Sequence, residues 1–325
     1  MRPFEYVTPA NTKQAASLLS ATWGETEILA GGTDLLALMK EDVVTPRRLI
    51  NIKEIKDLRG VNANAQGLRI GSLTTLAELA ADANVRRSHP ALADALQEAA
   101  SPQIRNLATL GGNLCQRPRC WYFRQGYGVL AMKDGRTLVT DGDNRYHAIF
   151  PNGPAYFVSA SSLGPALVAL SAKVKLVSVS GSRLVPVEKF FVAPQNDTAR
   201  EIALLPNEIL TEIVIPPANG VKNATYEVRH KEALDWPLVT ASVALTMQGS
   251  TVKSARIVLG HVGPTPHAAD QAEQALAGKA LSDANIQRAS EAASAGAQPL
   301  SQNGYKVKLA QVAVKRALLA ASGRA

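Results

Sequence analysis

The sequence predicts an α+β protein with two domains, and three observations lead to this prediction. Helical and strand patterns alternate along the first part of the chain. The segment IPPANG at 215–220 then breaks the pattern with prolines and a glycine. After the break, two long strand patterns precede three helical stretches, which is typical of an antiparallel sheet with helices on one side. We therefore expect a first domain over 1–220, with subdomains of about 1–60 and 61–220, and a C-terminal α+β domain over 221–325.

The first subdomain is predicted from helices and strands that alternate. Asn11, with Gln14 three residues later, resembles a capping box at the start of a helix over 15–19. The next elements expected are a short buried strand over 28–30, a helix over 35–39 and a second strand over 48–52.

The second subdomain is predicted to contain a long insertion between its strands and helices. From 117 to 152 the periodicity is lost and Gly, Arg and Asp become frequent, so we expect an inserted loop over about 115–152. Pro90 suits the first turn of a helix. Before the insertion we expect a strand over 67–72 and helices over 74–82 and 89–100. After it we expect renewed regular structure over 155–160, a helix over 163–170, and strands over 174–178 and 183–187.

The C-terminal domain is predicted from a hairpin and three helices. Two apolar strand patterns, 237–247 and 251–262, flank Gln248–Gly249–Ser250. The three helical stretches run over 267–277, 282–294 and 304–321, and Gly278 suits the position just after the first of them.

Composition excludes some classes of protein. The 325 residues are 46% hydrophobic and 19% charged, and no apolar run is long enough to span a membrane. The N-terminal segment lacks the basic and apolar regions of a secretory signal, so we expect a cytoplasmic protein, or a periplasmic one if a signal-bearing partner exports it. The net charge of +8 comes from scattered basic residues, which argues against a nucleic-acid partner.

Two double-glycine turns are the candidate binding elements. In AGGTD, residues 30–34, a strand turns into a helix through glycines that allow a ligand close to unpaired backbone amides, which suits an anion. The spacing is neither that of a Rossmann nor of a Walker motif, and alone it is more typical of a simple strand-to-helix turn than of a binding site. NLATLGGNLC, residues 106–115, repeats the device. We expect the main-chain amides of both turns to close around one elongated ligand, such as a dinucleotide.

The sequence offers no acid–base machinery to accompany these turns. His147, His230, His261 and His267 have no acid or nucleophile partner at the spacing of a known motif. We therefore predict no catalytic residues in this chain and favour a redox cofactor that supplies its own chemistry. Two cysteines are too few to complete a four-ligand metal or cluster site.

Five ordered motifs now identify a family resemblance. The chain resembles the FAD-binding medium subunit of the xanthine dehydrogenase family of molybdenum hydroxylases, and is most similar to the bacterial aldehyde oxidoreductase subunits that carry the insertion. The resemblance implies a two-subdomain FAD-binding domain of the para-cresol methylhydroxylase type, followed by a carbon monoxide dehydrogenase flavoprotein-like domain. The motifs are ILAGGTDLLALMK, SPQIRNLATLGGNLCQRPRCWYF, DGDNRYHAIF, LGHVGPTPHAA and PLSQNGYKVKLAQVAVKRAL.

The resemblance also implies a function within a heterotrimer. A large subunit with a molybdenum cofactor would oxidise an aldehyde or N-heterocycle, and a small subunit with [2Fe–2S] clusters would relay the electrons. Noncovalent FAD in this chain would pass them to an external acceptor. A stand-alone flavin oxidoreductase and an assembly subunit that has lost FAD remain as alternatives.

The cofactor contacts are carried over residue by residue. Backbone amides would hold the pyrophosphate at Leu29, Ala30, Gly31, Gly32, Thr33, Asp34 and Leu35. The second wall, near the pyrophosphate and ribityl chain, would be lined by Ala100, Thr109, Gly112 and Asn113. Leu204 would pack beside the flavin ring. Ser162 replaces an Asp that contacts the cofactor in relatives, and its hydroxyl can still bond an adenine or ribose group.

Two further departures from the family concern charge and iron. Glu227 aligns with a lysine near the flavin, so Arg229 and Lys231 are the candidates to supply the missing cation. Relatives with the insertion often bind a [4Fe–4S] cluster through four cysteines. Here Cys115 and Cys120 match the first two and the others are absent, so we expect no cluster and a structural pair of thiols.

Overall fold

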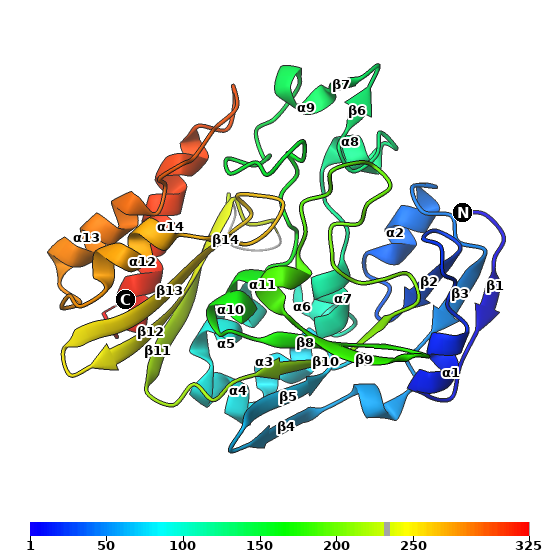
Figure 1. Ribbon diagram of the computed structural model, residues 1–325, viewed down its shortest axis with the longest axis horizontal. Helices are drawn as coiled ribbons and strands as arrows, with labels where there is room; N and C mark the ends of the chain where they lie inside the picture. The colour runs from blue at the N-terminus through cyan, green and yellow to red at the C-terminus, as the bar shows by residue number, and fades with distance from the viewer. Residues whose placement is uncertain (231–234, 325) are drawn as a thin grey trace.

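The computed structural model describes residues 1–230 and 235–324 (Figure 1). It has the α+β fold that the sequence predicts, with sheets of three, five and four strands and a small two-stranded ribbon. No helix within these described ranges is both long and apolar enough to cross a membrane.

The N-terminal subdomain is a small parallel sheet with two short helices. Asn11 accepts a hydrogen bond from the Gln14 amide at 2.9 Å, and the Gln14 side chain accepts one from the Ala10 amide, so the predicted cap is confirmed. The strand order is β1-β3-β2, which places the end of β2 and the start of α2 beside the next subdomain. The elements are β1 (Glu5–Val7), α1 (Thr12–Ser17), β2 (Thr26–Leu29), α2 (Leu35–Lys40) and β3 (Arg48–Asn51).

The second subdomain is a five-stranded antiparallel sheet covered by helices. Its order, β4-β5-β10-β8-β9, inserts β10 between two strands that come much earlier in the chain. The strands are β4 (Val61–Asn64), β5 (Gly67–Gly71), β8 (Lys173–Ser178), β9 (Gly181–Pro186) and β10 (Ile209–Ile215). The helices are η1 (Lys56–Leu58), α3 (Leu76–Ala81), α4 (Ala83–Ser88), α5 (Pro90–Glu98), α6 (Pro102–Arg105), α7 (Leu110–Cys115), α10 (Gly164–Ala169) and α11 (Val187–Phe190).

Two expectations for this subdomain are corrected. Residues 155–160 form no strand, and only an isolated bridge joins Asn152 to Ala155. Strand β10 was not predicted from the sequence, although its buried side chains pack in the main core of this subdomain.

The C-terminal domain is an antiparallel sheet with three helices packed on one face (Figure 1). The predicted hairpin is confirmed, with Gln248 paired to Thr251 across the turn. The predicted helix over 267–277 begins only at Asp270, because His267 and Ala268 pair as an edge strand. The elements are β11 (Val221–Val228), β12 (Val239–Gln248), β13 (Thr251–Gly260), β14 (His267–Ala268), α12 (Asp270–Leu276), α13 (Asp283–Ala292) and α14 (Tyr305–Ala321).

The insertion is irregular, as expected, but it is well anchored. Asn144 is fully buried, and its side chain donates to Ser301 Oγ at 3.0 Å and accepts from the Gln302 amide at 2.9 Å. At its other end, Phe123 and Leu130 pack with Leu38 of α2. The insertion therefore contacts both the first subdomain and the C-terminal domain. Its short elements are α8 (Trp121–Arg124), β6 (Met132–Lys133), β7 (Arg136–Thr137) and α9 (Leu138–Asp141).

Candidate functional site

The two double-glycine turns meet at one cavity between the subdomains. A Cβ at Gly31 would collide with the carbonyl oxygen of Leu107, so the backbones of the two turns lie in direct contact. Residues 26–38 and 109–117 line opposite sides of this cavity, and β10 and the segment before it close a third side. Nine of the thirteen residues predicted for the site line it: Ala30, Gly31, Gly32, Thr33, Asp34, Leu35, Thr109, Gly112 and Leu204.

The other four predicted residues lie outside the cavity lining. Leu29 is buried beneath the first turn, and Ser162 is buried with 4% of its surface exposed. Ala100 adopts a left-handed conformation, with φ of +53°, and its carbonyl accepts from Arg105 at 2.8 Å. Asn113 accepts from Ser161 Oγ at 2.7 Å, which joins the second turn to the segment containing Ser162. Their roles at a ligand stay predictions.

The first turn presents a row of unpaired amides. Among the described residues, none accepts a hydrogen bond from the amides of Gly31, Gly32, Thr33, Asp34 or Leu35. Gly32 has a φ of +74°, a conformation that side chains disfavour. Because α2 has only six residues, its dipole adds little, and the amides themselves are the main anion-binding groups. This geometry suits a diphosphate, whose oxygens only accept hydrogen bonds.

The second turn also has two glycines, but its amides donate hydrogen bonds to other groups of the chain. Leu110 donates to Thr74 O at 3.0 Å and Gly111 to Ser72 O at 2.9 Å. Gly112 donates to Thr109 Oγ1 at 3.1 Å, and Asn113 to Thr109 O at 2.8 Å. Only the first turn therefore has amides available to a ligand, and the expectation that amides of both turns surround it is wrong for the second turn. The second turn forms a wall that small residues allow to approach closely.

Comparisons with known proteins agree with this geometry. Residues 2–218 match the family model for the FAD binding domain in molybdopterin dehydrogenase, and residues 224–321 match the CO dehydrogenase flavoprotein C-terminal domain. The chain belongs to the FAD-binding subunits of the molybdenum hydroxylases.

Relatives match over the full length of this FAD-binding subunit. It is 31% identical to the aldehyde oxidoreductase FAD-binding subunit PaoB of Escherichia coli (strain K12), with 100% of both chains covered. It is 29% identical to the carbon monoxide dehydrogenase medium chain of Hydrogenophaga pseudoflava, over 99% of this chain and 98% of that one. The carbon monoxide dehydrogenase structure from the same organism superposes with a TM-score of 0.78 at 30% identity, covering 99% and 98% of the two chains.

The cavity of this FAD-binding subunit is bordered by charged side chains that the sequence analysis missed. Arg117 pairs with Glu201, and both side chains are largely buried. Arg200 lies 3.4 Å from a Glu27 carboxylate oxygen and 4.3 Å above the Trp23 ring. The three arginines of RPRCWYFR are conspicuous in the sequence, but it does not show their partners, which are remote along the chain.

The two thiols lie in different environments. Cys115 lines the cavity, and burial raises its pKa to about 12. Cys120 lines a second cavity of about 420 Å³, where its sulfur lies 3.2 Å from His147 Nε2. Both cysteines are free thiols, so the expected structural pairing is not a disulfide. Within the described residues, no group of three or more His, Cys, Asp or Glu side chains is placed to hold a metal ion.

Glu227, which the family resemblance aligns with a lysine, is a buried carboxyl group. Its side chain is 1% exposed, and burial raises its pKa to about 8 despite a 3.4 Å hydrogen bond from Thr240. Arg229 Nε lies 3.9 Å from Glu227, but the Arg229 guanidinium also pairs with Glu98. Lys231, the other candidate cation, lies outside the described residues.

Proposed function

We propose that this chain is the electron-exit subunit of a heterotrimeric molybdenum hydroxylase. In this assembly a large subunit with the molybdenum cofactor oxidises an aldehyde or N-heterocycle, and a small subunit with [2Fe–2S] clusters relays the electrons. Support comes from the relatives, which are FAD-binding or medium subunits of aldehyde oxidoreductase and carbon monoxide dehydrogenase. Bound FAD supplies the redox chemistry and delivers the electrons to an external acceptor.

The residues of this chain bind and orient the cofactor. The single observation that supports this role best is the row of five unpaired amides, Gly31 to Leu35, at the cavity between the subdomains. We propose that these amides hold the diphosphate and that Thr109 and Gly112 form the facing wall. Leu204 then contacts the flavin ring. Binding is noncovalent, because burial raises the pKa of the cavity-lining Cys115 thiol to about 12 and makes it a poor nucleophile.

Isolation of the full chain tests this function. We expect the purified protein to contain FAD, to release it as free flavin on denaturation, and to yield no flavin-bearing tryptic peptide. Coexpression with the neighbouring genes should yield a complex that contains molybdenum and iron, both in the other subunits. A chain that binds no FAD would support the assembly-subunit alternative. A chain that oxidises a substrate alone would support the stand-alone enzyme.

A further inference from the structure

Asp34 occupies a position where a carboxylate would normally cap a helix, yet it does not cap. It is the N-cap residue of α2, and its side chain accepts no hydrogen bond from that helix. An N-cap carboxylate usually accepts from the second or third amide of its helix. The amide of Ala37, the third residue of α2, has no partner among the described residues. The capping position is therefore available, and Asp34 points elsewhere.

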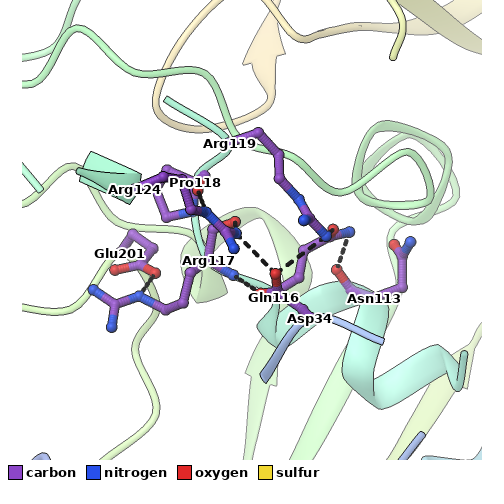
Figure 2. Close-up of polar contacts among 8 residues, drawn as sticks. All are labelled: Asp34, Asn113, Gln116, Arg117, Pro118, Arg119, Arg124 and Glu201. Carbon is purple, nitrogen blue, oxygen red and sulfur yellow. Dashed lines mark hydrogen bonds and ion pairs between the residues drawn. The ribbon is translucent and has the colours of Figure 1, made fainter. Parts of the chain in front are cut away.

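The insertion holds the Asp34 carboxylate from three directions, as Figure 2 shows. The Arg117 amide donates to Asp34 Oδ2 at 2.8 Å. Arg124 Nη2 donates to Asp34 Oδ1 at 2.8 Å, and Arg119 Nη2 lies 3.1 Å from the same oxygen. Arg124 is itself fixed, because its Nε donates to Pro118 O at 2.9 Å. We call Asp34, Arg119 and Arg124 the arginine clamp.

The side chains of the clamp are partly buried, and charge interactions are stronger there than at the exposed surface. The side chains of Asp34 and Arg124 are each 14% exposed, and that of Arg119 is 31% exposed, with its guanidinium 4.7 Å above the Trp236 ring. Two guanidinium groups face one carboxylate, so the clamp offsets the negative charge of Asp34 beside the amides of the first turn. Partly buried pairs of this kind are screened less by salt than surface pairs.

Release of Asp34 would work against cofactor binding. A free carboxylate at this position would accept from the Ala37 amide and place a negative charge at the turn. That charge would repel the diphosphate, which needs the unpaired amides of Gly31 to Leu35. The insertion would then have a task at the cofactor site that does not depend on binding iron.

We propose that Arg119 and Arg124 are positioning residues that hold the Asp34 carboxylate away from the diphosphate-binding turn. This inference rests on the proposed function, in which the turn binds FAD. Neither arginine needs to touch the cofactor. Each acts through Asp34, and the prediction that follows is that loss of the arginines matters only while Asp34 is present.

The test compares FAD affinity in full-length variants by calorimetry. In the Arg119→Gln/Arg124→Gln variant, we expect the FAD dissociation constant to rise about tenfold, which is the size of one lost or gained capping interaction. Adding Asp34→Ala removes the carboxylate but keeps the backbone amide, and should restore affinity to within about threefold of wild type. Arg145→Gln is the matched control, because Arg145 is in the same insertion and pairs with Asp143 at the surface.

A second measurement needs no cofactor. Amide hydrogen exchange at Ala37 should slow in the double arginine variant, because Asp34 then caps it, and should return to the wild-type rate on adding Asp34→Ala. If the double variant does not fold, Arg124→Gln with and without Asp34→Ala gives the same comparison.

The outcomes separate the clamp from the proposed function. A triple variant that binds FAD as weakly as the double variant overturns the inference, since the arginines would then act by supporting the insertion alone. Unchanged affinity in the double variant also overturns it. If the wild-type chain binds no FAD at all, it is the proposed function that fails, and the exchange experiment still decides whether the clamp restrains Asp34.

Discussion

Replacing Gly31 with alanine should separate the two walls of the cofactor cavity. The new Cβ would collide with the Leu107 carbonyl oxygen and lie 2.8 Å from the carbonyl carbon and 3.2 Å from Ala108 Cα. Ordinary Cβ contacts are 3.4 Å or longer, so the Leu107 backbone must retreat by more than about half an ångström. All three contacts are main-chain atoms, which cannot turn aside as a flexible side chain would.

The expected cost is that of an overpacked interior, about 1–3 kcal/mol in the free energy of unfolding. The displacement falls on the residues just before Thr109, so the second wall moves away from the amides of the first turn. If about half of that cost, roughly 0.5–1.5 kcal/mol, is also lost from the free energy of FAD binding, the FAD dissociation constant rises about two- to tenfold, because 1.4 kcal/mol is a factor of ten.

Calorimetric FAD titration and urea unfolding of the full chain measure both effects. Gly304→Ala is the matched control, because Gly304 has a φ of −57° and a Cβ there meets no atom within 4 Å. It should change stability by less than about 0.5 kcal/mol and leave FAD affinity unchanged. A Gly31→Ala protein with wild-type affinity and stability would refute the reasoning, since the two turns could not then be in rigid contact.

Three further predictions concern buried polar groups. Because burial raises the Glu227 pKa from 4.5 to about 8, folding stability should fall by roughly 3–5 kcal/mol as pH rises through that window, and Glu227→Gln should remove this loss in urea titrations at several pH values. Asn144→Ala should lower the free energy of unfolding by about 1–3 kcal/mol, because it leaves the Gln302 amide without its acceptor, and thermal melts at fixed pH would detect the change. Cys115 and Cys120 should react slowly with iodoacetamide in the folded chain and rapidly in urea, since burial raises both thiol pKa values; rapid alkylation of the folded chain would contradict this prediction.

Local features of the fold could be predicted from the sequence because they depend on neighbouring residues. The cap at Asn11, the first double-glycine turn and the hairpin at Gly249 all follow from short patterns. Strand β10 was missed for the opposite reason. Its partners, β5 and β8, lie far from it in the chain, and a register shift near Leu210 interrupts its regular pairing. Single-sequence periodicity does not reveal which distant strands share a sheet.

The residues of the candidate site likewise include some that local sequence predicts and others that depend on contacts between remote segments. The amides of Gly31 to Leu35 are unpaired because of local turn geometry, so the sequence could indicate them. The arginine clamp could not be anticipated, because Asp34 lies 90 residues from Arg124 in the sequence. Nothing in RPRCWYFR distinguishes arginines that hold a carboxylate from arginines that face water.

The two double-glycine turns show why a repeated motif need not repeat a function. In the first turn, the amides face a cavity and have no acceptor within the described chain. In the second turn, the carbonyls of Ser72 and Thr74, just after β5, take the amides of Gly111 and Leu110. A Cβ at Gly111 would lie 2.8 Å from Ser72 Cβ, so this glycine serves close packing, whereas at Gly31 it lets the two walls meet. The double glycine is the same in both turns, and the neighbouring segment decides whether the amides remain available to a ligand.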